Sequence, residues 1–258
     1  MTLQPLYDSK KGIMQVAGLM SGSGTNLRRI IEQEIYLKQN SSSPYHVAVI
    51  FSDNPESNAE TIGKEYEIPV VINDKKLFYK NRGKPLRDLT VRAEFDSLTV
   101  EMLKPLHINV AAYAGYMSIA TLPLIKAFLG INVHPADLSI LNEQGKPKYV
   151  GDHAVRDAIL AGEKHIYSTT HVISGDVDCG QILMVSSPIE VILENFDRTV
   201  PQNVVDAEKS NQDRLKVGGD WIIFPKTILD IAQGRFSFYK GVLCYDEKPV
   251  PNGLRLIK

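Results

Sequence analysis

The sequence has 258 residues, of which 43% are hydrophobic and 23% charged, a composition typical of a globular protein that buries its own core. A net charge of −1 provides no basic field for nucleic acid, two cysteines exclude a disulfide framework, and no apolar run is long enough to span a membrane. The first residues also lack an apolar signal segment, so we expect a cytoplasmic protein that binds neither nucleic acid nor a membrane.

The first half of the chain alternates apolar runs, which predict strands, with segments of helical spacing. Strands are predicted at 13–20, 46–51, 68–72, near Val110 and around Asn132. Helices are predicted from Leu27 to a break at 41–44, from Pro55 onward, at 86–103 and at 122–128. The segment 74–85 is charged and predicts a solvated loop.

The second half has a different pattern. After an exposed loop at 142–146 and a helix at 151–160, two alternating runs at 166–173 and 181–191 predict an antiparallel pair joined at 176–180. The remaining predicted elements are helices at 199–215 and 221–231, with Gly218 and Gly219 between them, and a hairpin at 236–244 that turns at Lys240 and Gly241. The whole pattern predicts an α/β fold: a Rossmann-like, mostly parallel sheet with helices on both faces and antiparallel strand additions in the C-terminal half.

A glycine-rich turn follows the first strand and leads into the first helix. Its residues are Gly22, Ser23, Gly24, Thr25 and Asn26. The free N–H groups of a helix N-terminus bind anions, so this turn predicts a phosphate site. It is not the dinucleotide fingerprint, because Leu27 stands where the third glycine would be. A plain strand-to-helix connection explains the turn equally well.

A second polar pattern lies at the end of a later strand, in Asn132-Val133-His134-Pro135. Residues i and i+2 of a strand point to the same face, so an amide and an imidazole project side by side. A carboxylate from the distant turn, either Asp176 or Asp178, would complete a set that polarises a carbonyl and moves a proton. Spacing alone does not separate the two aspartates. Histidine, cysteine and acidic residues are too scattered to predict a metal site.

Together these motifs resemble those of the folate-dependent formyltransferases, over nearly the whole chain from about residue 14 to 236. The resemblance rests on segments 19–27, 51–54, 114–117, 131–135, 146–151, 171–173 and 178–180. It implies a single formyltransferase domain over 1–258, with a phosphate-binding Rossmann-like half at 13–130, a catalytic and folate half at 131–240, and a tail at 241–258.

The resemblance also implies the chemistry and the roles of the residues. A formyl group would pass from 10-formyltetrahydrofolate to an amine, that of glycinamide ribonucleotide, with Asn132, His134 and Asp178 as the catalytic set. The match thereby selects Asp178 over Asp176 as the catalytic carboxylate. The substrate phosphate would lie at the turn from Gly22 to Asn26. The implied folate-binding residues are Tyr116, Met117, His171, Gly175 and Asp176, and the implied sugar-binding residue is Asp220. The expected partners are small-molecule substrates, and a homo-oligomer is left open.

Three departures from the family pattern affect the substrate sites. Ser118 stands where the family usually has an arginine beside the folate site, and Asp220-Trp221 replaces a Glu-His pair that helps to bind the ribonucleotide. About eight residues, near 139–146, are inserted after the Asn-x-His-Pro segment. These departures leave open a different amine acceptor, such as an amino sugar nucleotide.

Two further alternatives stay open. One is a formyltetrahydrofolate hydrolase with water as acceptor, although such enzymes usually carry an N-terminal regulatory domain for which the segment before Met14 leaves no room. The other is a non-catalytic protein that binds folate or a nucleotide. The presence of all three catalytic residues, Asn132, His134 and Asp178, argues against this alternative.

Overall fold

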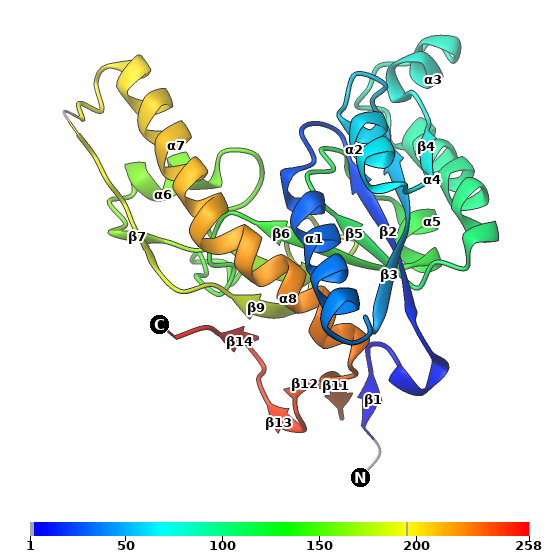
Figure 1. Ribbon diagram of the computed structural model, residues 1–258. Helices are drawn as coiled ribbons and strands as arrows, with labels where there is room; N and C mark the ends of the chain where they lie inside the picture. The colour runs from blue at the N-terminus through cyan, green and yellow to red at the C-terminus, as the bar shows by residue number, and fades with distance from the viewer. Residues whose placement is uncertain (1–2, 195, 258) are drawn as a thin grey trace.

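A computed structural model describes residues 3–194 and 196–257 (Figure 1). Its centre is an eight-stranded sheet whose spatial order is β14-β9-β8-β6-β5-β2-β3-β4. In that order the strands are Leu254–Arg255, Ile182–Val185, Thr169–Val172, Leu129–His134, Val110–Tyr113, Met14–Met20, Tyr45–Ser52 and Val70–Ile72. From β6 to β4 all neighbours are parallel, whereas β8 is antiparallel to both β6 and β9. The predicted fold class, mostly parallel with antiparallel additions, is confirmed.

Helices pack on both faces of this sheet, as the sequence predicts. The α-helices are α1 Thr25–Asn40, α2 Ala59–Tyr66, α3 Lys75–Asn81, α4 Leu89–Leu103, α5 Leu122–Ala127, α6 Ala154–Leu160, α7 Pro201–Leu215 and α8 Trp221–Ala232. Alternate residues of β2 enter different cores: Val16 packs in the cluster that holds residues of α1 and α8, and Leu19 in the one that holds residues of α4 and α5. The parallel strands are therefore buried on both sides.

The antiparallel part of the fold is built mainly from the second half of the chain. Short strands β7 His165–Ile166 and β10 Ile189–Glu190 form their own ladder beside α6 and α7. The predicted terminal hairpin is confirmed as β11 Phe236–Tyr239 and β12 Val242–Tyr245. The edge strands β1 Gln4–Pro5 and β13 Lys248–Pro249 complete its four-stranded sheet. Two 3-10 turns are η1 Ser9–Lys11 and η2 Lys104–Leu106.

One prediction is wrong. The charges of segment 74–85 predict a solvated loop, but the segment contains α3. Asp74 caps this helix by accepting a hydrogen bond from the Leu77 backbone N–H at 3.0 Å. Tyr79 is almost fully buried, and the ring of Phe78 meets that of Phe95 edge-to-face at 5.2 Å. Two aromatic side chains dock this short helix, although three of its seven residues are lysines.

The two helices predicted near the C-terminal end exist, but no break separates them. The π-helix η3, Lys216–Asp220, joins α7 to α8. A Cβ atom on Gly219 would lie only 2.4 Å from Oγ of Ser168, so glycine serves here to let the helix approach the sheet. In residues 3–194 and 196–257 we find no helix long and apolar enough to cross a membrane.

Candidate active site

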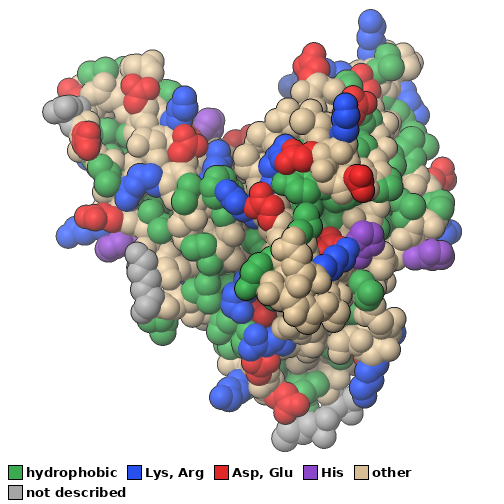
Figure 2. All heavy atoms as spheres, viewed as in Figure 1, with side chains coloured by type: hydrophobic (Ala, Val, Ile, Leu, Met, Phe, Trp, Pro, Cys, Tyr) green, Lys and Arg blue, Asp and Glu red, His purple; other side chains and the backbone are tan. Residues whose placement is uncertain are grey.

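A cavity of about 720 Å³ lies where the parallel strands of the sheet end. The space-filling view shows a deep notch between the part of the molecule that carries α6 and α7 and the part that carries α2 and α3 (Figure 2). Every site residue predicted from the sequence lines this cavity: Gly22, Ser23, Gly24, Thr25, Asn26, Tyr116, Met117, Asn132, His134, His171, Gly175, Asp176, Asp178 and Asp220. Ligands of open α/β sheets bind at this end of the strands, so we take this cavity as the candidate active site.

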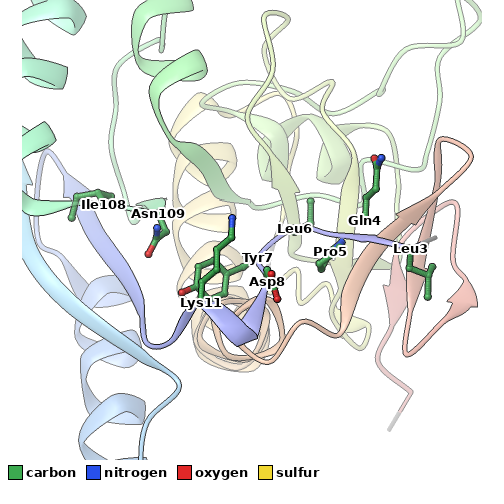
Figure 3. Close-up of a pocket in the computed structure, with 9 residues that line it drawn as sticks. All are labelled: Leu3, Gln4, Pro5, Leu6, Tyr7, Asp8, Lys11, Ile108 and Asn109. Atoms are coloured by element: carbon green, nitrogen blue, oxygen red, sulfur yellow. The ribbon is translucent and has the colours of Figure 1, made fainter.

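A second cavity, of about 540 Å³, lies at the opposite end of the sheet (Figure 3). N-terminal residues around Tyr7 and Asp8 line it, together with Ile108 and Asn109, which precede β5. It contains none of the predicted site residues. Its position at the amino ends of the parallel strands argues against a catalytic role.

The glycine-rich turn has the backbone that an anion site needs. Gly24 is the N-cap of α1 and has a φ of 69°, a left-handed conformation that favours glycine. A Cβ atom there would also lie 2.5 Å from Cδ1 of Ile62. The first turn of α1 contains no acidic residue, so its free N–H groups present positive potential to the cavity.

Asn132 and His171 face each other across the antiparallel pair β6 and β8. Nδ2 of Asn132 lies 3.2 Å from Nε2 of His171, and Nδ1 of His171 lies 3.1 Å from the carbonyl oxygen of Val172. Because a carbonyl only accepts, Nδ1 of His171 donates and its Nε2 accepts from the amide. The imidazole therefore fixes the orientation of the Asn132 side chain, which keeps its second amide hydrogen for a ligand.

His134 is 4% exposed and lies between two oxygen atoms. Its Nε2 is 2.9 Å from the carbonyl oxygen of Tyr149, and its Nδ1 is 3.4 Å from Oδ2 of Asp178. By the same reasoning Nε2–H donates to Tyr149, so the bare nitrogen of the neutral ring is Nδ1, beside the carboxylate. A proton delivered to Nδ1 would be stabilised at once by Asp178.

Asp178 is held by its backbone and by its neighbours. It has a φ of 55°, which aspartate tolerates better than most residues, and its Oδ2 accepts a hydrogen bond from the Gly151 N–H at 3.0 Å. Its Oδ1 lies 3.6 Å from Nε2 of His171. One carboxylate thus contacts both imidazoles of the cavity. The neighbouring Asp176, the other candidate from sequence, lines the cavity without an ion pair to either histidine.

The surroundings shift the pKa of both groups of the pair. Burial lowers the pKa of His134, and the negative charge of Asp178 and the Tyr149 carbonyl oppose that effect only partly. Burial alone would raise the pKa of Asp178, but His171, the charge of His134 and the Gly151 N–H together hold it below its usual value. At neutral pH the site therefore holds a neutral imidazole next to an ionised carboxylate.

Asp220 joins the helical wall of the cavity to the glycine-rich turn. Its Oδ1 accepts a hydrogen bond from the Ser168 hydroxyl at 2.5 Å, and its Oδ2 accepts one from Nδ2 of Asn26 at 3.3 Å. Burial raises the pKa of Asp220, against the effect of these hydrogen bonds and of the Lys216 charge. Both of its oxygen atoms are thus engaged inside the protein.

The structure adds wall residues that the sequence motifs did not indicate. Gln212 and Lys216 reach the cavity from α7 and the π-helix, and Asp152 reaches it from the segment before α6. Gln212, Lys216 and Asp220 are spaced four residues apart, which places them on one face of a helix. Because Asp220 is a predicted site residue, this spacing was a signal that could have identified Gln212 and Lys216. Among the described residues, no group of three or more histidine, cysteine or acidic side chains could hold a metal ion.

A comparison with models of protein families shows which family the chain belongs to. The family model described as formyl transferase matches residues 14–212. The chain belongs to the formyl transferase family. This membership confirms the predicted family and shows that the protein is an enzyme of a family that uses formyltetrahydrofolate.

Individual relatives of this formyl transferase agree with the assignment. The phosphoribosylglycinamide formyltransferase of Haemophilus influenzae is 25% identical over 239 residues, which are 92% of this chain and 96% of that protein. The trifunctional purine biosynthetic protein adenosine-3 of Bos taurus is 27% identical over 247 residues, or 95% of this chain, which spans only 21% of the longer protein.

Solved structures show the same fold. Phosphoribosylglycinamide formyltransferase from Coxiella burnetii superposes with a TM-score of 0.72 at 20% identity, covering 95% of this chain and all of the other. Glycinamide ribonucleotide transformylase 1 from Symbiobacterium toebii superposes with a TM-score of 0.68 at 23% identity, covering 90% and 94%. The overall fold is therefore shared with these two proteins.

Proposed function

We propose that this enzyme transfers the formyl group of 10-formyltetrahydrofolate to the amine of glycinamide ribonucleotide, a reaction of purine biosynthesis. The observation that carries the proposal is the convergence of Asn132, His134 and Asp178 in one cavity with the anion-binding turn at the start of α1. The 25% identity to a phosphoribosylglycinamide formyltransferase along its full length supports this acceptor.

The geometry suits each part of an acyl transfer. Asn132 lines the cavity, and the amide hydrogen that is not used by His171 stabilises the negative charge that develops on the formyl oxygen. Nδ1 of His134 takes the proton that the amine loses as its nitrogen bonds to the formyl carbon. Asp178 stabilises the resulting imidazolium, which returns the proton to the nitrogen that leaves the formyl carbon. His171 is a positioning residue that orients Asn132.

The walls of the cavity suit the two substrates. The N–H groups at the start of α1 bind the phosphate of the ribonucleotide. Elsewhere in the cavity lining, the exposed apolar side chains of Met117, Ile119 and Val177 offer an apolar surface to the folate rings. The donor supplies the activated formyl group. The backbone at Gly175 and Asp176, together with Tyr116 and His171, completes its site.

A second acceptor has one observation in its favour. Both oxygen atoms of Asp220 are bonded to Ser168 and Asn26, and Trp221 lies under the guanidinium of Arg29, whose carbon is 4.2 Å from the ring centroid. Asp220 and Trp221, which stand in place of the Glu-His pair, thus make contacts within the protein rather than presenting polar groups to a sugar. This arrangement favours a different amine, such as an amino sugar nucleotide.

A turnover assay separates these functions. Loss of the formyl group of 10-formyltetrahydrofolate is followed with glycinamide ribonucleotide, with an amino sugar nucleotide, and without any amine. Turnover that requires the ribonucleotide supports the proposal, and turnover that requires the amino sugar replaces it with the second acceptor. Turnover without an amine identifies a hydrolase, whereas folate binding without any turnover identifies a non-catalytic binding protein.

A further inference from the structure

A buried carboxylate, Asp53, lies behind the cavity and takes no part in the chemistry described above. It directly follows β3, is 2% exposed, and is surrounded by three donors. The Ser21 hydroxyl donates to its Oδ1 at 2.6 Å, and the Ser118 hydroxyl donates to its Oδ2 at 2.5 Å. Nζ of Lys75 lies 3.0 Å from the same Oδ2.

The two hydroxyl donors belong to two neighbouring loops at the cavity, those that follow the paired strands β2 and β5. Ser21 directly precedes the glycine-rich turn, whereas Ser118 directly follows Tyr116 and Met117. A further bond joins these loops, because the Met117 backbone N–H donates to Oγ of Ser21 at 2.9 Å. Asp53 therefore cross-links the loop after β2 to the loop after β5 at their exits from the sheet.

Lys75 supplies the counter-charge of this network from the first turn of α3. Its Nζ donates to the Ser118 hydroxyl at 2.5 Å, which leaves the hydroxyl hydrogen of Ser118 for Asp53. A buried carboxylate without a cation is strongly unfavourable, so Lys75 and Asp53 depend on each other. The short hydroxyl of Ser118 completes the network between Asp53 and Lys75.

We propose that Asp53 is a positioning residue that fixes the phosphate-binding turn relative to the donor-binding loop, with Lys75 as its counter-charge. The separation of the two loops sets how well each substrate binds, while the catalytic set on β6 and after β8 is left in place. The inference rests on the proposed function, from which it takes the two substrate sites.

Two variants test this role through Michaelis constants. Asp53→Asn keeps the shape but loses the charge that both hydroxyls and Lys75 contact, and should raise KM for donor and acceptor about tenfold, since hydrogen bonds to charged groups contribute that much or more. Ser118→Ala releases only the donor-side loop and should raise KM for the donor alone. In both variants kcat should stay close to the wild-type value.

The matched control is Asp230→Asn. Asp230 is also buried, at 1% exposed, and its Oδ2 lies 2.9 Å from Nζ of Lys226, but it lies on α8 and does not line the cavity. This variant should lower the melting temperature without changing either KM. If Asp53→Asn or Ser118→Ala behaves like the control, with unchanged KM values, Asp53 is merely structural and the proposal fails.

Binding measurements separate this proposal from the proposed function. If wild type shows no turnover with glycinamide ribonucleotide, the proposed function fails, but tetrahydrofolate and inorganic phosphate remain usable probes of the two loops. Ser118→Ala, a surface-accessible change that should fold, must then weaken tetrahydrofolate binding about tenfold and leave protection by phosphate against thermal unfolding unchanged. Equal tetrahydrofolate binding by wild type and Ser118→Ala overturns the positioning role.

Discussion

Nδ1 of His134 and Oδ2 of Asp178 lie 3.4 Å apart inside the cavity. Since Nε2 of the same ring donates to the Tyr149 carbonyl at 2.9 Å, the imidazole can exchange a proton only through Nδ1. The pair is therefore arranged so that the histidine accepts a proton next to a carboxylate that stabilises it.

Replacing His134 by alanine should lower kcat by about 10²–10⁴-fold, which is the usual contribution of a positioned general base. Turnover is measured with donor and acceptor at saturation, and circular dichroism with a thermal melt checks the fold. His46→Ala is the control, because that imidazole is paired with Glu34 at 2.7 Å, outside the cavity. An alanine variant of His134 with full activity would remove this residue from the mechanism.

The Asp178→Asn variant should change the pH profile as well as the rate. The charge of Asp178 raises the pKa of His134, against the lowering by burial. If the neutral imidazole is the active form, activity in wild type is lost as the pH falls through a pKa below about 6.5. Without the carboxylate that pKa falls further, so the acid limb of the profile should move to lower pH while kcat decreases.

The free energy of unfolding, like the activity, should decrease as the pH falls. Because the pKa of His134 is lower in the folded state than in the unfolded state, wild type should lose stability as the pH drops below about 6.5. Asp178, whose pKa is also lowered, adds stability that is lost only as the pH falls below about 3.9. Denaturant unfolding of wild type and His134→Gln between these pH values measures the first effect. Identical pH dependence in the two proteins would contradict it.

Asn132→Ala should lower kcat by about 10²–10³-fold, the usual loss when one donor to a developing oxyanion is removed. The donor should still bind, because the proposed donor site is formed mainly by other residues, around Met117 and Gly175. Asn109→Ala is a matched control: its Oδ1 accepts from the Gln15 backbone N–H at 2.8 Å at the amino end of the neighbouring strand. An equal loss of kcat in both variants would show that Asn132 acts only through the fold.

How far the sequence predicted the site depends on the range of each interaction. The period-two pattern of a strand places Asn132 and His134 on one face, and parallel strands bring their exits together, so the cavity was predictable from local signals. The Tyr149 carbonyl was not, because a backbone acceptor leaves no trace in residue type. The network of Asp53, Lys75 and Ser118 was equally hidden, since it joins three segments far apart in the sequence.

The same reasoning explains the wrong prediction at 74–85. Five basic residues, Lys75, Lys76, Lys80, Arg82 and Lys84, give the segment the composition of a solvated loop. Asp74 was an available cap signal, but only tertiary packing of Phe78 and Tyr79 makes so short a helix stable. Elements of one or two turns are decided by their neighbours more than by their own sequence.

The turn that carries Asp178 provides a final test, at Gly180. A Cβ atom on this residue would lie 1.7 Å from the carbonyl oxygen of Val172, too close for any side chain. The backbone N–H of Val172 also donates to the carbonyl of Gln181 at 2.9 Å. The clash would therefore displace the residue whose hydrogen bond closes the turn. Gly180→Ala should therefore lower the free energy of unfolding by roughly 1–3 kcal/mol, as overpacking of a closed site does.

The same substitution should also lower kcat, because the displaced backbone lies two residues from Asp178. Gly175→Ala is the control in the same loop: a Cβ atom there meets no atom within 4 Å. Denaturant unfolding should distinguish the two variants, with Gly175→Ala within about 0.5 kcal/mol of wild type, as expected for an unhindered surface substitution. If Gly180→Ala instead kept both wild-type stability and wild-type kcat, the turn would be adaptable, and a fixed position of Asp178 could not be part of the mechanism.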